Sequence, residues 1–242
     1  MKLLVLFGLA VLASGEVLQK GDQEVAVREH NNWRRKTAKG ETSEKNGKPQ
    51  PSAADMTQLV WDDDVAKSAN AWVETCPMPG PHGHEEQVQY GENIAWGSPP
   101  HKYPIDRMIG MWYHEIDETP GSLGGTVGMF QMSMVGHGIG HYTQMMSAKG
   151  RRVGCGYKEC DGKAVLVCRY LLGGNIDGEP IYAQGPPCSA CQSWQTCNDG
   201  LCDGDPWDCS NEHPDCGTEW YPADTCDDSF TIEMCPNMCG LC

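Results

Sequence analysis

The chain has 242 residues, enough for one domain of ordinary size and a smaller module beside it. Its formal net charge is −15, and because no Lys or Arg follows Arg169, the last part of the chain carries nearly all of this imbalance. A surface of that sign repels phosphate backbones and anionic lipids, which argues against a nucleic-acid-binding or membrane-surface protein. No later stretch approaches the roughly 18 apolar residues that a transmembrane helix needs, so we expect no membrane span.

The first fifteen residues have the features of a secretory signal peptide. A short apolar run from Leu3 to Leu12 follows Lys2, and the small residues of 13–15 suit a signal-peptidase site. We therefore expect residues 1–15 to be removed and the mature protein to be secreted, extracellular and monomeric.

Three segments have the periodicity of amphipathic helices. The first is predicted over residues 23–37, and the second from the acidic run 62–64 to Cys76. A third is predicted from Pro104 to Ile116, with apolar residues at spacings of three and four. Between them, residues 38–53 and 77–89 are predicted loops, and residues 119–140 show no assignable pattern.

Residues 153–170 predict a β-hairpin. Apolar and aromatic residues alternate on both sides of Asp161-Gly162, which is a preferred dipeptide for two-residue hairpin loops. Facing strands would bring Cys155 and Cys168 close enough for a disulfide if the local pairing allows it. Residues 173–187, which follow, have the composition of a linker.

Cysteine is concentrated at the end of the chain. Ten of the 14 cysteines lie between Cys188 and Cys242. An even number in a secreted chain predicts disulfides that hold together a segment too short to build its own core. The spacing of Cys188 and Cys191, and of Cys239 and Cys242, also suits zinc, but the expected secretion favours disulfides.

Seven short motifs, in order, resemble those of the CAP superfamily of cysteine-rich secretory proteins, antigen 5 and pathogenesis-related 1 proteins. They are His30-Asn31-x-x-Arg34, Leu59-x-Trp61-Asp62 through Trp72-x-x-x-Cys76, Gly91-Glu92-Asn93-Ile94, Trp112-Tyr113-x-Glu115-Ile116, Gly140-His141-Tyr142-Thr143-Gln144, Val153-Gly154-Cys155-Gly156, and Cys168-x-Tyr170 with Gly174-Asn175. The resemblance implies an α+β fold, an α-β-α sandwich over residues 16–182. One departure is Ser147, which stands where the family usually has Trp; Met145 and Met146 are flexible enough to fill that space.

The tail resembles the cysteine-rich part of the same secretory proteins. Residues 183–207 resemble their hinge, and residues 208–242 an ShKT module, the fold of a sea-anemone potassium-channel toxin. The disulfides that the resemblance implies are Cys76–Cys160, Cys155–Cys168, Cys188–Cys197, Cys191–Cys202, Cys209–Cys242, Cys216–Cys235 and Cys226–Cys239. Spacing alone leaves this connectivity open.

The resemblance also implies a central cleft lined by two histidines and two glutamates. The matching positions are Glu92, Glu115, His141 and a histidine of the 77–89 loop, where we prefer His82 and keep His84 as the reserve. Two imidazoles can hold a divalent metal such as zinc, and a glutamate can polarise a bound water. The alternative is that each glutamate only holds a histidine or backbone amides in place.

The function that we favour is non-enzymatic and requires no cofactor. It is that of a secreted binding or effector protein, of a venom or a secretory gland, acting on an extracellular protein receptor or ion channel. Pore block by a lysine, as in the toxin, is not expected, because residues 227–234 are acidic and contain no Lys.

Two alternatives remain for the function. One is a metal-assisted hydrolase that uses the cleft; a serine mechanism has only the nearness of Ser147 to His141 in sequence behind it, whereas triads are recognised by geometry. The other is an extracellular lipid or sterol carrier. Five methionines could line its pocket: Met129, Met132, Met134, Met145 and Met146.

Overall fold

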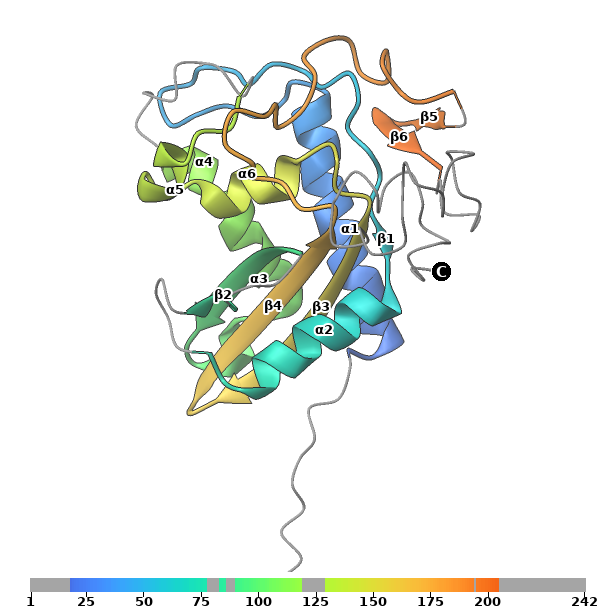
Figure 1. Ribbon diagram of the computed structural model, residues 1–242. Coiled ribbons are helices and arrows are strands. Elements are labelled where there is room, and N and C mark those ends of the chain that lie inside the picture. The colour runs from blue at the N-terminus through green and yellow to red at the C-terminus, as the bar shows by residue number, and fades with distance from the viewer. Residues whose placement is uncertain (1–17, 78–82, 86–89, 119–128, 194, 205–242) are drawn as a thin grey trace, which may run out of the picture.

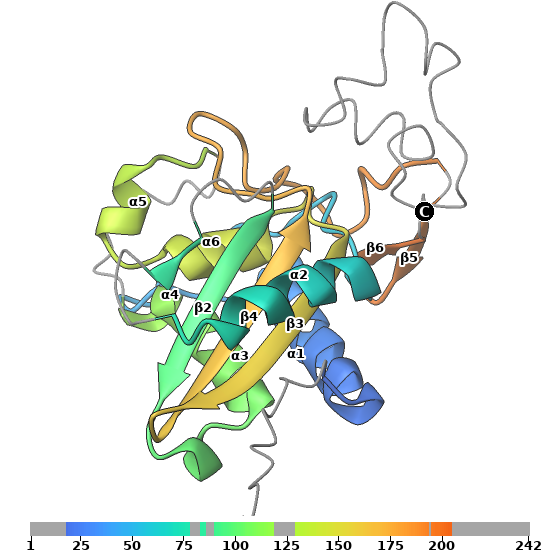
Figure 2. The ribbon, with the colours of Figure 1, turned by 60° about the horizontal axis from the view of Figure 1, so that its bottom comes forward.

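The computed structural model describes residues 18–77, 83–85, 90–118, 129–193 and 195–204. These ranges form an α-β-α sandwich in which helix α2 covers one face of a sheet and helices α1, α3 and α6 lie behind the other (Figures 1 and 2). The predicted signal peptide, 1–15, and the predicted ShKT module, 208–242, lie outside the described residues. Within the described ranges, no helix combines the length and the apolar character that crossing a membrane requires.

The predicted hairpin is the centre of a four-stranded sheet with strand order β1-β3-β4-β2. Strands β3 (Arg152–Cys160) and β4 (Lys163–Leu171) are antiparallel, and Cys155 lies opposite Cys168. Asp161 and Gly162 have φ angles of 49° and 75°, the left-handed geometry that favours this dipeptide in a two-residue turn. The hairpin prediction is therefore confirmed in both strands and in the turn.

The two outer strands complete the sheet. Strand β1 (Val60–Trp61) pairs in parallel with β3, and β2 (Gly91–Gly97) pairs antiparallel with β4. Neither strand was predicted, because β1 is only two residues long and β2 has an uninterrupted buried stretch rather than alternation.

The first two helices lie where they were predicted. Helix α1 (Lys20–Ala38) begins at Lys20 rather than at Gln23. Helix α2 (Asp63–Glu74) begins after Asp62, whose carboxylate accepts hydrogen bonds from the backbone N–H groups of the next turn. Past its end, Cys76 is bonded to Cys160, with Cα atoms 5.7 Å apart.

The third predicted helix is broken in two. Helix α3 (Ile105–Tyr113) ends with His114 as its C-cap, and a separate turn, α4 (Glu115–Glu118), follows. Pro104 is the N-cap rather than the first helical residue. The predicted apolar stripe is buried throughout: Ile105, Met108, Ile109, Trp112 and Ile116.

Three short elements escaped prediction: the 3-10 turn η2 (Pro100–Lys102), helix α5 (Ser133–Gly136) and helix α6 (Gly140–Met146). Helix α6 buries polar residues such as Thr143 and Gln144 as well as apolar ones, so it lacks an amphipathic pattern. Met145 and Met146 are fully buried beside Ser147, as expected if they fill the space of the missing Trp.

Residues 173–187 are packed against the domain and do not form a free linker. The backbone N–H of Ala148 donates to Ile181 O, and that of Phe130 donates to Glu179 O. Ile181 and Tyr182 are buried in the main core. The linker prediction was wrong here. It relied on the Gly and Pro content of the segment, whereas two large apolar residues, Ile181 and Tyr182, anchor the segment to the core.

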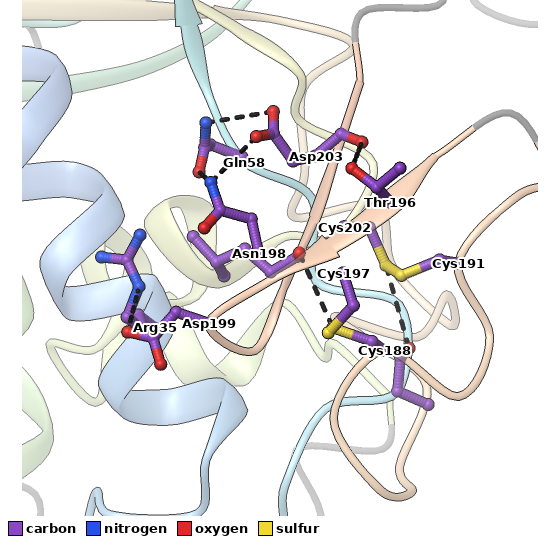
Figure 3. The surroundings of a disulfide bond; sticks show 12 residues. Arg35, Gln58, Cys188, Cys191, Thr196, Cys197, Asn198, Asp199, Cys202 and Asp203 are labelled. Carbon is purple, nitrogen blue, oxygen red and sulfur yellow. Dashed lines mark hydrogen bonds and ion pairs between the residues drawn. A yellow bond between two sulfur atoms is a disulfide. The ribbon is translucent and has the colours of Figure 1, made fainter.

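The hinge ends in a two-stranded sheet, β5 (Thr196–Asn198) and β6 (Leu201–Asp203). Two disulfides hold it, Cys188–Cys197 and Cys191–Cys202 (Figure 3). Because Cys188 and Cys191 bond to different cysteines, they are not a zinc pair. With Cys76–Cys160 and Cys155–Cys168, four of the implied pairs are present, and the other three lie outside the described residues.

Candidate functional site

Four of the expected side chains surround one cavity of about 240 Å³ beside the N-terminus of α6. They are His84, Glu92, Glu115 and His141, and Asn93 and Asn175 complete the polar lining. The rings of His84 and His141 are stacked, with centroids 6.0 Å apart. The preferred His82 lies outside the described residues, and the reserve, His84, occupies the cleft.

Glu92 is held on both of its oxygens. Its Oε1 accepts hydrogen bonds from His84 Nδ1 at 2.9 Å and from the backbone N–H of Glu85 at 3.3 Å. Its Oε2 accepts from Arg169 Nε, also at 2.9 Å. The Glu92 and Arg169 side chains are only 4% and 2% exposed, so this is a buried ion pair that fixes the carboxylate in one orientation.

Arg169 is a residue of the site that the sequence motifs did not single out. It is the unnamed position between Cys168 and Tyr170, on a strand whose neighbours are buried and apolar. Its guanidinium also contacts Ser68 of α2 and the carboxylate of Glu85. A charged residue inside an apolar strand is the signal that could have identified it, because such a group is buried only when it is paired.

Glu115 caps helix α6 from outside. Its Oε2 accepts hydrogen bonds from the backbone N–H groups of His141 and Tyr142, both at 2.9 Å. Its Oε1 accepts from the His141 ring, with Nδ1 at 2.5 Å. A carboxylate is stabilised at a helix N-terminus, where backbone donors lack partners within the helix. The break between α3 and α4 places Glu115 at this position.

Both histidines therefore place Nδ1 against a carboxylate. A neutral imidazole that donates from Nδ1 keeps a lone pair on Nε2. A carboxylate behind Nδ1 is also typical of histidines that bind metals, because it fixes the ring and raises its basicity. The described residues contain no group of three or more His, Cys, Asp or Glu side chains suited to a metal ion. A divalent cation in this cleft would thus have two imidazoles from the described chain, with solvent completing its shell.

A buried hydrogen-bond chain supports the cleft from below. Asn93 Nδ2 donates to His141 O at 3.0 Å and to Tyr170 Oη at 3.2 Å. The Tyr170 hydroxyl lies 2.8 Å from His30 Nε2, and His30 Nδ1 lies 2.8 Å from Ala26 O. Burial lowers the pKa of His30 to about 4, so the ring is neutral at pH 7, donates to Ala26 O and accepts from Tyr170.

The other polar residues of the first motif bind backbone groups. Asn31 pairs through its side chain with both the N–H and the C=O of Leu59, in the manner of a neighbouring strand. Arg34 is 1% exposed and donates to the carbonyls of Thr57, Met145 and Ser147. The motif thus joins α1 to β1 and to the end of α6 rather than supplying cleft chemistry.

The structure also places the residues of two alternative functions. Ser147 is buried at the C-cap of α6, and His141 lies in its first turn, so the helix separates them. The five methionines differ in exposure: Met134, Met145 and Met146 are buried, whereas Met129 and Met132 are 49% and 60% exposed.

The α-β-α sandwich and its cleft of paired histidines and glutamates are the features of a CAP-type α+β domain. The family described as "Cysteine-rich secretory protein family" matches residues 27–170, more than half of the chain. The protein belongs to this family.

Relatives and solved structures agree with this assignment. Venom allergen 5 2 of Polybia paulista is 37% identical over 173 residues, which cover 67% of this chain and 80% of the relative. Scoloptoxin SSD976 of Scolopendra dehaani is 38% identical over 180 residues, 72% of this chain and 80% of the relative. Among solved structures, Na-ASP-1 is 29% identical with a TM-score of 0.68, over 78% of this chain and 49% of that one. NaASP2 with Zn2+ is 26% identical with a TM-score of 0.67, over 78% and 98%.

Proposed function

We propose that the chain is a secreted, non-enzymatic binding protein of the venom-allergen kind, acting on an extracellular protein receptor or ion channel. The observation that carries this proposal is that both cleft carboxylates are engaged, Glu92 by Arg169 and Glu115 by the N-terminus of α6. Both carboxylates therefore already accept hydrogen bonds from groups of the protein itself, which fits a role in holding the cleft together better than a role as a base acting on a substrate.

The relatives support the same proposal. Their names, venom allergen and scoloptoxin, describe them as venom or toxin proteins. The signal-like first fifteen residues and the disulfides fit an oxidising, extracellular setting. We place the partner-binding surface in the acidic tail, because charge of one sign favours a partner of the opposite sign.

The test applies the oxidised full chain to a panel of extracellular receptors and ion channels expressed in cells. We expect a saturable change in signalling or current that Glu115→Gln retains. Phe230→Ala with Ile232→Ala, which removes apolar contact residues from the acidic 227–234 segment of the tail, should abolish it. Ile176→Ala is the matched control, because Ile176 is an exposed apolar residue of the sandwich, 42% exposed. Hydrolysis of peptide or ester substrates by the wild type, abolished in Glu115→Gln, would contradict the proposal.

A second candidate is divalent-metal binding in the cleft. It is favoured by the two imidazoles that line one cavity, each with its Nδ1 against a carboxylate. Among the similar solved structures, that of NaASP2 is one with Zn2+. When bound, such a metal would supply a Lewis acid; here the residues that would hold it are His84 and His141, while Glu92 and Glu115 would orient the rings.

Calorimetric titration of zinc, and then of calcium, into metal-stripped protein tests this candidate. We expect zinc to bind with micromolar affinity, and His84→Ala with His141→Ala to abolish the heat. His114→Ala is the control, because that histidine pairs with Asp117 on the exposed surface. Binding that survives the double variant but is lost in His82→Ala would show that the preferred histidine is the ligand instead.

A further inference from the structure

Acidic and polar side chains already anchor the hinge to the first helix. Asp199, in the turn between β5 and β6, pairs with Arg35 Nε at 3.1 Å and with Lys39 Nζ at 2.5 Å. Asp203 accepts a hydrogen bond from Gln58 Nε2 at 3.1 Å (Figure 3). The described chain therefore ends, at Gly204, directly beside Gln58.

A groove of about 430 Å³ starts at Gln58 and runs along the N-terminal half of α1. Strand β1 and the preceding residues form one wall and α1 the other; the lining residues are Lys20, Gln23, Glu24, Val27, Arg28, Asn31, Gln58, Leu59, Val60 and Trp61. Val27 and the 59–61 segment make its floor apolar, and the exposed Lys20 and Arg28 lie at its rim. The helical stripe of this groove continues, at spacings of three and four, into Arg35 and Lys39, which bind the hinge.

The edge of β1 that faces α1 can receive an extended segment. The N–H groups of Val60 and Asp62 donate to Arg151 O and Val153 O on the β3 side. Backbone groups alternate along a strand, so those of Leu59 and Trp61 face α1, where the Asn31 side chain already pairs with Leu59. Asn31 thus shows how polar groups can pair with this edge, two residues before Trp61.

We propose that the segment directly after the hinge, Asp205-Pro206-Trp207-Asp208, packs into this groove with the indole of Trp207 between α1 and β1. Trp207 lies three residues beyond Gly204, and an extended chain spans about 3.3–3.6 Å per residue, so it reaches about 10 Å along the groove. Pro206 biases the residue before it toward an extended backbone.

Charge and continuity single out this segment over other occupants. Lys20 and Arg28 line the groove together with Glu24, and Arg28 pairs with Glu29. Lys20 is therefore the base that Asp208 would meet, in the manner of Asp199 with Lys39. The contact would extend the hinge interface and orient the acidic tail against the sandwich. It does not depend on which partner the tail recognises.

Photo-crosslinking of the full chain tests the contact. With p-benzoylphenylalanine in place of Trp207, we expect crosslinks within the same molecule to peptides that contain residues 20–31 or 58–61. The same probe in place of Trp220 is the matched control and should not reach these peptides. Crosslinks from position 207 only to other peptides, or only between copies in a mixture of isotopically light and heavy protein, would overturn the proposal.

Hydroxyl-radical footprinting tests the same contact without an introduced crosslinking residue. In Trp207→Ala, we expect a several-fold faster oxidation of Trp61 than in the wild type, while Trp220→Ala leaves the rate unchanged. Disulfide mapping confirms that each variant keeps the four described bridges, and the rate at Trp72, on α2, reports any general opening. Equal rates at Trp61 in the wild type and in Trp207→Ala would refute the contact.

Discussion

At the scale of single residues, the polar side chains of the CAP motifs act mainly as struts for backbone and ring positions. Glu115, Asn93 and Arg34 each join segments distant in the sequence; Asn93 and Arg34 are buried, and Glu115 is partly buried. An intramolecular hydrogen bond of this kind adds little net stability. Removing one partner costs more, because the other polar group then stays buried without a hydrogen bond. This asymmetry can be measured at His30 and at Arg34.

His30 should make stability depend on pH. Burial holds its pKa at about 4 in the folded state against 6.5 in the unfolded state. The unfolded chain therefore binds more protons between these values, and folding stability should fall by about 3 kcal/mol as the pH drops from about 6.5 to 4. Urea unfolding across this range should show a steeper loss in the wild type than in His30→Gln. Parallel curves for the two proteins would refute this role.

Arg34 should tolerate no apolar replacement. Arg34→Met leaves the buried carbonyls of Thr57, Met145 and Ser147 without their donor, and we expect a loss of about 3–5 kcal/mol in the free energy of unfolding. Arg28→Met removes only an exposed pair with Glu29 and should cost less than about 1 kcal/mol. Chemical denaturation of both variants measures the difference. Equal losses would mean that the hydrogen bonds of Arg34 to these carbonyls do not stabilise the fold.

At the scale of elements, close packing of α2 on β3 depends on glycine. A Cβ at Gly154 would lie 2.1 Å from Ala66 N, and one at Gly156 would lie 2.6 Å from Asn70 Cα. In both cases the obstacle is helix backbone, which cannot rotate away as a flexible side chain could. The Val153-Gly154-Cys155-Gly156 motif thus sets the distance between the helix and the sheet.

Gly154→Ala should therefore destabilise the sandwich by about 3 kcal/mol, the upper end of the cost of overpacking. Gly136→Ala, in α5, is the matched control, because its Cβ would meet nothing within 4 Å and alanine favours helix. Thermal unfolding monitored by circular dichroism separates the two variants. An unchanged melting temperature in Gly154→Ala would show that α2 can shift outward freely.

At the scale of the whole molecule, the disulfides differ in the length of chain that they close. Cys76 and Cys160 are 84 residues apart, and Cys188 and Cys197 are 9 apart. In the chain-entropy model, replacing the first pair by serines should cost about 4–5 kcal/mol and the second about 2–3 kcal/mol. Urea unfolding of the two double variants tests this order, and a larger loss for the hinge pair would contradict it.

Much of the fold could be predicted from local spacing. The hairpin, the first two helices and the buried stripe of the third follow from the spacing of apolar residues, at intervals of two to four positions, which a sequence displays directly. The resemblance to the family supplied Glu92, Glu115 and His141, with His84 as the reserve for His82. Secretion, the ShKT module and the metal remain predictions.

Sequence by itself therefore determined the period of each main element, the excess of negative charge in the tail and the family. Tertiary structure alone decided that Arg169 holds Glu92, that Glu115 caps α6, and that the polar face of α6 is buried. It also brought the hinge onto α1, where Asp199 meets Lys39 across 160 residues of chain. The reason is physical: these partners meet only after the sheet and helices have packed, and no spacing along the chain encodes such pairings.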